Sequence, residues 1–163
     1  MTDRVEKILK QWKNERPDLD TSPMGIIGRV WRLERILTKS VQQILSKYDL
    51  NHGEFDVLCV LRRSGEPYSL TPSRLLRSLM LSSGALTNRI DRLEEAQMVM
   101  RSANPNDRRG VVVSLTTKGL AVINEAIESH VANEHILVEG ISKQEQQQLA
   151  KLLKKLIVSL GNL

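Results

Sequence analysis

A short β-hairpin pattern interrupts an otherwise helical sequence, and this feature most restricts the possible folds. Residues 99–102 are compatible with a strand, residues 104–107 read Asn-Pro-Asn-Asp, and residues 111–113 are all valine. β-Branched residues favour strands, whereas Asn, Pro and Asp favour turns. We therefore expect one hairpin with helices on both sides of it.

Two short helices are predicted directly before the hairpin. The Thr71-Pro72 pair indicates the start of the first, which we expect to end near residue 79. A serine at position 82 or 83 can cap the second, which reaches about residue 96. The connection between them, Met80-Leu81, is very short. Two short helices joined in this way form a helix-turn-helix pattern.

Longer amphipathic helices are predicted nearer the two ends of the chain. Apolar residues recur at helical spacing over residues 5–12, and the Arg16-Pro17 pair ends that helix because the residue before proline disfavours the α conformation. The Ser22-Pro23 pair indicates a cap and first turn of a long helix that reaches about residue 48.

Further capping signals mark three more helices. Asn51 with Glu54, and Ser142 with Glu145, have the spacing of capping boxes, and Thr116 can cap a long helix after the hairpin. The terminal helices each carry an apolar stripe without an evident local partner. We expect these stripes to form a dimer interface.

The composition limits the classes of function. The 163 residues include 24 Lys and Arg against 19 Asp and Glu, a net charge of +5 that suits a polyanionic partner without proving one. The single cysteine excludes an internal disulfide framework. The opening residues MTDRVEKILK lack the apolar segment of a signal peptide, and no run approaches the roughly 18 apolar residues of a membrane span. We expect a cytoplasmic protein with no membrane partner.

Catalytic and metal-binding motifs are missing from the sequence. It contains no phosphate-binding loop, no dinucleotide fingerprint and no plausible Ser-His-Asp arrangement. His130 and His135 are five residues apart without a matching cysteine or carboxylate pattern, so no metal site is predicted. We expect neither an enzyme nor a bound cofactor.

One contiguous motif resembles a known family. Residues 107–119 read DRRGVVVSLTTKG and fit the pattern D-x-R-x-x-x-V-x-L-T-x-x-G at every fixed position. This pattern is the signature of the MarR family, and the helix order resembles that family from about Pro23 to Leu160. The resemblance implies a triangular dimer built from N- and C-terminal helices, with two winged helix-turn-helix lobes on a pseudo-palindromic operator.

The predicted fold is therefore mainly α with a small β-hairpin wing, a winged helix-turn-helix with N- and C-terminal dimerisation helices. We expect an N-terminal extension helix and linker over residues 1–22 and a long helix contributing to dimer and core over 23–50. The DNA-binding lobe is expected over 51–116 and the C-terminal dimerisation helices over 117–163.

The second helix of the helix-turn-helix has distinct faces when its residues are placed about 100° apart. Leu86, Ile90 and Leu93 point inward, and small polar side chains point outward. Asn88 can pair with adenine, and Thr87 can contact a thymine methyl group or a phosphate. The residues predicted to contact DNA are Ser83, Gly84, Thr87, Asn88, Arg92, Arg108 and Arg109.

The wing is expected to add a second DNA contact. A narrow minor groove concentrates negative potential, so we expect Arg109 to enter it while Asp107 braces the turn. The predicted function is a transcription regulator, a repressor, that binds double-stranded DNA as a homodimer. The alternative is a helical dimeric protein-interaction adaptor with a winged-helix fold that no longer binds DNA.

Four separate residues resemble one branch of the MarR family, the PecS-like urate-responsive regulators. That branch carries a tryptophan in an extra N-terminal helix, an aspartate in the third helix, and arginines in the recognition helix and at the start of the wing. Trp12, Asp56, Arg89 and Arg101 match these in order and element, and residues 11–20 resemble the branch's N-terminal stretch. The resemblance implies that a small anion, urate or a related anionic purine or phenolic compound, lowers the affinity for DNA.

The chemistry of these residues fits a planar anion. A guanidinium can bind it in a bidentate manner, an indole can stack on it, and a carboxylate can accept its ring N–H. Arg89 lies about 60° from the apolar centre of its helix, so it should turn partly towards the protein body and need a partner. We expect it to pair with Asp56 in the DNA-competent state and to leave that pair for the ligand. A purely structural ion pair with a core tryptophan is the alternative.

Three other residues receive structural interpretations. Trp31 is more consistent with a core position than with a dimer interface or pocket wall. Cys59 lies among apolar neighbours and is expected to be a buried small hydrophobe rather than a redox sensor. His52, near the start of the third helix, is a weaker candidate for pH sensing.

Overall fold

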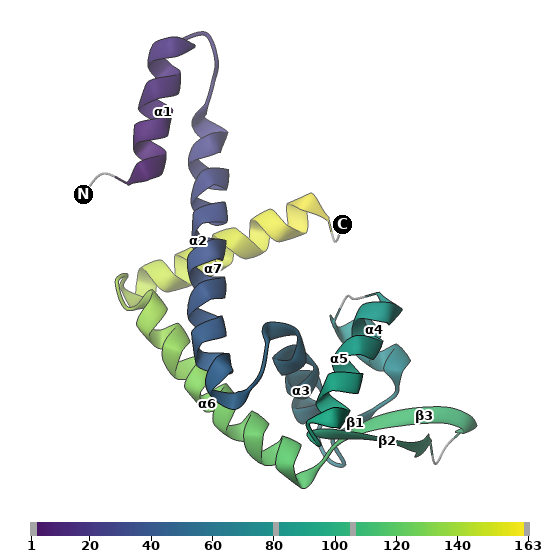
Figure 1. Ribbon diagram of the computed structural model, residues 1–163. Coiled ribbons are helices and arrows are strands. Elements are labelled where there is room, and N and C mark those ends of the chain that lie inside the picture. Colours follow the sequence, from purple (N-terminus) through teal and green to yellow (C-terminus); the bar gives the residue numbers. More distant parts are fainter. Residues whose placement is uncertain (1–2, 80–81, 105–106, 162–163) are drawn as a thin grey trace. The chain divides into compact units, whose positions relative to one another are not determined.

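Helices form most of the described chain, and a small antiparallel sheet is built from three strands between Ser69 and Leu115. The computed structural model describes residues 3–79, 82–104 and 107–161, without the side chains of residues 108 and 109. The helices and strands are labelled in Figure 1. In chain order they are α1 (Arg4–Glu15), α2 (Ser22–Leu45), the 3-10 helix η1 (Ser46–Tyr48), α3 (His52–Arg63), β1 (Ser69–Leu70), α4 (Pro72–Leu79), α5 (Ser83–Glu95), β2 (Val99–Asn104), β3 (Asp107–Leu115), α6 (Thr117–Val138) and α7 (Lys143–Leu160).

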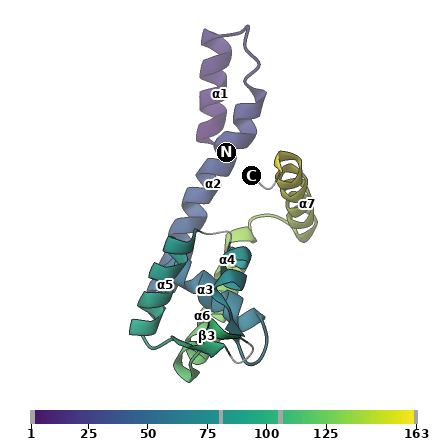
Figure 2. The same cartoon turned by 90° about the vertical axis from the view of Figure 1, so that its right-hand side faces the viewer.

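The chain divides into two units, Met1–Gln43 and Ile44–Leu163. In the first unit, α1 and α2 run side by side in opposite directions (Figures 1 and 2). Asp3 caps α1 by accepting the Glu6 N–H at 2.7 Å, and Arg29 of α2 donates to its carboxylate at 2.8 Å. The α1 helix ends at Glu15, as the proline at position 17 predicts.

The long helix α2 begins one residue earlier than predicted. Ser22 is its first helical residue rather than its cap. The reason is local, since the Asp20 carboxylate accepts the Ser22 N–H at 2.9 Å and the Thr21 carbonyl accepts the Met24 N–H at 3.0 Å. The preceding loop therefore supplies the hydrogen bonds that the serine side chain was expected to provide.

In the second unit, α3 lies at the centre and packs against α4, α5 and α6. Its start carries the predicted capping box, with Asn51 and Glu54 each bonding the other's backbone N–H. The side chains of Val57, Leu58 and Leu61 have no exposed surface. Burial of these apolar groups holds α5 against α3 and so fixes which side of α5 faces outward.

The predicted hairpin is present as β2 and β3, which pair in an antiparallel manner from Val99 opposite Leu115. The strand order is β1-β3-β2, with Ser69 of β1 opposite Ser114. Strand β1 was not predicted, because two residues are too few to show an alternating pattern. Asp107, expected within the turn, is the first residue of β3.

A close backbone contact joins the hairpin to α6. Thr116 caps this helix by accepting the Gly119 N–H at 3.0 Å, as predicted. A Cβ atom at Gly119 would lie 1.8 Å from the carbonyl oxygen of Met98, which is far below any allowed contact. Only glycine lets α6 begin so close to β2, and this explains the last fixed position of the MarR signature.

The second predicted capping box is also present, because Ser142 and Glu145 bond reciprocally at the start of α7. Several apolar side chains of α2 and α7 remain largely exposed in the single chain. On α7, Leu152 is 64% exposed and Val158 is 71% exposed. Each helix in the described ranges is too short or too polar to cross a bilayer.

Candidate DNA-binding face and ligand site

The helix α5 has one buried face and one exposed face. Leu86, Ile90 and Leu93 are only 2%, 2% and 1% exposed, which confirms the predicted inward direction. The residues predicted to contact DNA from this helix lie on the exposed side. They are Ser83, Gly84, Thr87, Asn88 and Arg92.

Small side chains make the first turns of α5 accessible to a large partner. A Cβ atom at Gly84 would meet no atom within 4 Å, and the Thr87 hydroxyl donates to the Ser83 carbonyl at 3.1 Å. The side chain of Asn88 is hydrogen-bonded to none of the described residues. Its amide is therefore free to read a base edge.

Arg92 lies farther along the same face and is held only loosely. Its Nη1 is 3.8 Å from the Glu54 carboxylate, and its side chain is 62% exposed. Glu54 is buried and already accepts the Asn51 N–H in the capping box, so the exposed Arg92 end of this long contact is the part that can move. The guanidinium can therefore turn to a phosphate at small cost.

The hairpin supplies the other part of the predicted DNA-binding face. The side chains of Arg108 and Arg109 lie outside the described residues. Asp107 is exposed at the start of β3, and its Oδ2 would lie 3.2 Å from a Cβ atom at Gly110. The side chain of Asn104 approaches the same point, so glycine at 110 leaves room for both polar groups beside the strand.

Arg89 is half-buried and turned towards α3, as its position on the helix predicts. Its Nη1 donates to the Gly53 carbonyl at 3.4 Å. A Cβ atom at residue 53 would lie 2.5 Å from both Cζ and Nε of Arg89. The guanidinium thus occupies space that any residue other than glycine would fill.

The expected ion pair between Arg89 and Asp56 is not formed. The Oδ2 atom of Asp56 instead lies 4.0 Å from His52 Nε2, one turn away on the same helix. The prediction failed because Gly53 lets the guanidinium lie directly on the backbone of the first turn of α3. The guanidinium of Arg89 nevertheless reaches the first turn of α3, and Asp56 lies in the N-terminal half of the same helix.

Arg101, the third residue of β2, is joined to two carboxylates of α5. Its Nη2 donates to Asp91 at 2.5 Å, its Nη1 donates to Glu94, and its backbone N–H donates to Glu94 Oε1 at 3.0 Å. Asp91 and Glu94 were not predicted as partners of Arg101. A signal was available, because acids three residues apart on a helix share one side.

Trp12, the fourth residue of the predicted ligand set, belongs to the other unit. It lies on α1 and is 40% exposed, so its indole is available for stacking. It is not a core side chain, which was the alternative interpretation. The helix that carries it is fixed at both ends, by Asp3 at its start and by the Arg16 N–H bonded to the Trp12 carbonyl at its end.

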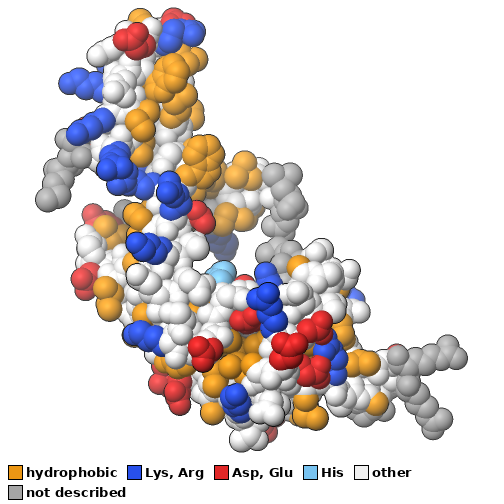
Figure 3. Space-filling view, viewed as in Figure 1, with side chains coloured by type: hydrophobic (Ala, Val, Ile, Leu, Met, Phe, Trp, Pro, Cys, Tyr) orange, Lys and Arg blue, Asp and Glu red, His pale blue; other side chains and the backbone are white. Residues whose placement is uncertain are grey.

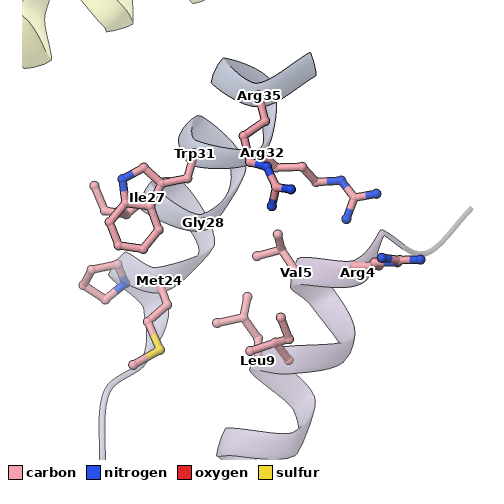
Figure 4. Close-up of a pocket in the computed structure, with 11 residues that line it drawn as sticks. Arg4, Val5, Leu9, Met24, Ile27, Gly28, Trp31, Arg32 and Arg35 are labelled. Carbon is pink, nitrogen blue, oxygen red and sulfur yellow. The ribbon is translucent and has the colours of Figure 1, made fainter. Parts of the chain in front are cut away.

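The first unit also contains an open groove of about 660 Å³ between α1 and α2. Figure 4 shows apolar side chains from both helices along it, with Arg4, Arg32 and Arg35 gathered towards one end. Trp31 lines this groove and is 69% exposed. The expectation of a core position for Trp31 is wrong in this chain, because no other described element of the first unit covers that side of α2.

Cys59 is half-buried rather than fully buried as predicted, but its pKa fits an unreactive thiol. Burial raises its pKa to about 11, and the negative charge of Asp56 acts in the same direction. Reaction requires the thiolate, so a raised pKa suppresses it.

A polar helix face beside a basic hairpin, on a lobe of this topology, defines a winged helix-turn-helix DNA-binding protein.

Comparison with known proteins agrees with this class. The MarR family profile matches residues 50–111. The transcriptional regulator PecS of Dickeya dadantii is 41% identical over 158 residues, covering 97% of this chain and 95% of PecS. The multiple antibiotic resistance protein MarR of Escherichia coli is 34% identical over 131 residues, covering 77% of this chain and 89% of MarR.

The chain belongs to the MarR family and is a transcriptional regulator of the MarR/PecS type. The named relatives are regulators rather than enzymes. Among solved structures, a cysteine-to-serine mutant of E. coli MarR complexed with operator DNA has a TM-score of 0.71 and 30% identity. The match covers 90% of this chain and 97% of that protein. The predicted family and fold class are therefore confirmed.

Proposed function

We propose that this regulator is a cytoplasmic repressor that binds a pseudo-palindromic operator as a homodimer and releases it when a small anion such as urate binds. The observation that carries the DNA-binding part is the exposed face of α5, which is polar and has no large apolar side chain among its described residues. A protein-docking surface would present aromatic or aliphatic anchors at such a place.

In this proposal α5 enters the major groove by its N-terminal half. Asn88 pairs with adenine, and Thr87 contacts a thymine methyl group or a phosphate. Arg92 neutralises a phosphate from the flank of the helix. Arg109 enters the adjacent minor groove from the wing, with Arg108 beside it.

A homodimer is supported by the apolar surface that the single chain leaves exposed. Figure 3 shows hydrophobic side chains gathered over α1 and the first part of α2. Apolar residues exposed in such number require a partner surface. The large examples on α2 and α7 are Met24, Ile26, Ile27, Val30, Trp31, Leu33, Ile36, Leu37, Leu149, Leu152, Leu153, Ile157, Val158 and Leu160.

The ligand part of the proposal assigns the anion to Arg89 and Arg101, with Asp56 accepting a ring N–H. Trp12, in the first unit, is a separate candidate contact whose exposed indole can stack on a planar anion. Arg89 gives a mechanical connection, since it leaves its place over Gly53 to bind the anion and lies on the helix that contacts DNA. Coupling on the order of 1–3 kcal/mol lowers operator affinity about 5- to 150-fold. The 41% identity to PecS supports the choice of this branch.

The direct test is a titration of the protein against its own upstream intergenic DNA, repeated with urate, xanthine and salicylate. We expect binding that weakens steeply with salt, because phosphate contacts release counterions. We expect urate to release the DNA at a concentration at which xanthine and salicylate have no effect. Indifference to duplex DNA even at low ionic strength would overturn the proposal and favour the adaptor alternative.

Arg89→Ala separates the ligand response from DNA binding. We expect this variant to remain dimeric and to bind DNA while no longer responding to urate. Arg63→Ala is the matched control, because it removes an exposed guanidinium from the far end of α3. If Arg89→Ala still releases DNA at the wild-type urate concentration, Arg89 is not the ligand contact.

A further inference from the structure

Arg101 lies between two carboxylates that hold it in place. Asp91 and Glu94 accept from its two terminal nitrogens, and Glu94 also accepts from its backbone N–H. We call these three residues the Arg101 clamp. Figure 3 shows acidic and basic side chains gathered together over α5.

The clamp joins the base of the wing to the recognition helix. Arg101 belongs to β2, and both acids belong to α5. Its guanidinium is the more buried member, with 31% of the side chain exposed against 51% for Asp91 and 40% for Glu94. A planar guanidinium bonded at both terminal nitrogens has a fixed orientation, so the strand and the helix are held as one body.

The charge of the clamp opposes an incoming anion. One guanidinium faces two carboxylates, so the cluster carries a net charge of −1 when all three groups are ionised. An anion that bonds Arg101 must displace at least one carboxylate or accept repulsion from both. The terminal nitrogens needed for bidentate binding are the ones already in use.

We propose that Asp91 and Glu94 compete with the anionic ligand for Arg101. The two acids thereby set the ligand concentration at which DNA is released, and their displacement frees the wing from α5. This inference rests on the proposed function, which assigns an anion to Arg101. It adds Asp91 and Glu94 as residues that set the sensitivity of DNA release to the ligand by competing with it rather than by binding it.

The test uses Asp91→Asn and Glu94→Gln in the full-length protein, with urate as the probe. Glu95→Gln is the matched control, since Glu95 is the next residue of the same helix, is exposed, and makes no interaction with the described residues. It removes the same charge without touching the clamp. Any general gain in anion affinity from lost negative charge therefore appears in all three variants.

Urate affinity is measured directly by calorimetry without DNA, and operator affinity is measured separately without urate. We expect Asp91→Asn and Glu94→Gln each to tighten urate binding about 3- to 10-fold beyond Glu95→Gln. We also expect weaker operator binding in the two clamp variants, because the wing is no longer fixed to α5. Melting temperatures verify that all variants are folded, and either clamp variant alone suffices for the comparison.

Equal urate affinity in the clamp variants and Glu95→Gln would overturn the inference, as would weaker urate binding in the clamp variants. Failure of the proposed ligand is recognised differently. If the wild-type protein does not bind urate at all, the ligand assignment and the competition both fall, and this is visible before any variant is made.

Discussion

The guanidinium of Arg89 lies directly against the α-carbon of Gly53, with Cζ 2.5 Å from the position that a Cβ atom would take. The two residues belong to α5 and α3, so the contact joins the recognition helix to the helix at the centre of the lobe. The absence of a side chain at residue 53 is what allows Arg89 to turn inward. The inward position of the Arg89 side chain in the structure therefore depends on glycine at residue 53.

Gly53→Ala should displace Arg89 without damaging the fold. Alanine in a helix is favoured over glycine by roughly 0.5–1 kcal/mol, so α3 itself should not be weakened. Because the guanidinium is already displaced, urate no longer has to move it. We expect the urate concentration for half-release of DNA to fall several-fold, as measured by fluorescence anisotropy of a labelled operator.

Gly140→Ala is the control for this change, because a Cβ atom there would meet nothing within 4 Å. It should leave the response as in the wild type. An unchanged response in Gly53→Ala as well would show that the position of Arg89 over Gly53 plays no part in release.

Gly119→Ala should destabilise the lobe strongly. Its Cβ atom would lie 1.8 Å from the Met98 oxygen, and this obstacle is backbone rather than a flexible side chain. The start of α6 must move away from β2, which also strains the Thr116 cap. We expect the free energy of unfolding to fall by about 1–3 kcal/mol or more, measured by urea denaturation at fixed protein concentration. A stability equal to that of Gly140→Ala would contradict this close approach.

Much of the fold could be predicted because its signals are local. Capping boxes, the proline at position 17 and the valines of β3 each determine conformation within a few residues. The inward face of α5 follows from helical periodicity alone. These features depend on neighbours in sequence, and the structure confirms them.

The site was harder to predict because its contacts join separate elements. The pairing of Arg89 with Asp56 was inferred from charge, but the absence of a side chain at Gly53 decided the outcome. The Arg101 clamp depends on how the wing packs against α5, and the periodicity of apolar residues along the sequence does not predict this packing. Trp31 was assigned to the core from its type, although its exposure depends on what lies over α2.

Cys59 should react very slowly with thiol reagents in the native protein. Burial raises its pKa from an ordinary value of 9.0 to about 11, so the thiolate population near neutral pH falls by about 100-fold. The unfolded thiol ionises at a lower pH than the native one. The contribution of Cys59 to the free energy of unfolding is therefore lost as the pH rises from about 9 towards 11. Iodoacetamide labelling at pH 7.5, with and without urea, measures this, and equally fast labelling in both would refute it.

Val158→Glu should separate the proposed dimer into folded monomers. Val158 is 71% exposed in the single chain, so the substitution costs little there but buries a charge in an interface formed by α7. We expect light scattering to give half the wild-type mass while circular dichroism stays helical. Lys155→Glu, on the same helix, changes charge at an exposed polar position and serves as the comparison. A wild-type mass for Val158→Glu would exclude this part of α7 from the interface.

The recognition helix is anchored unevenly along its length. Its C-terminal end is tied by the Arg101 clamp and by Lys118, which donates to the Ala96 carbonyl at 2.8 Å, whereas Ser82 makes no side-chain capping bond at the other end. Thirteen helical residues span about 20 Å. The helix is thus a lever with its fulcrum beside the wing, and a tilt of about 5° there moves the opposite tip by nearly 2 Å. A hydrogen bond to a base edge tolerates far less than that.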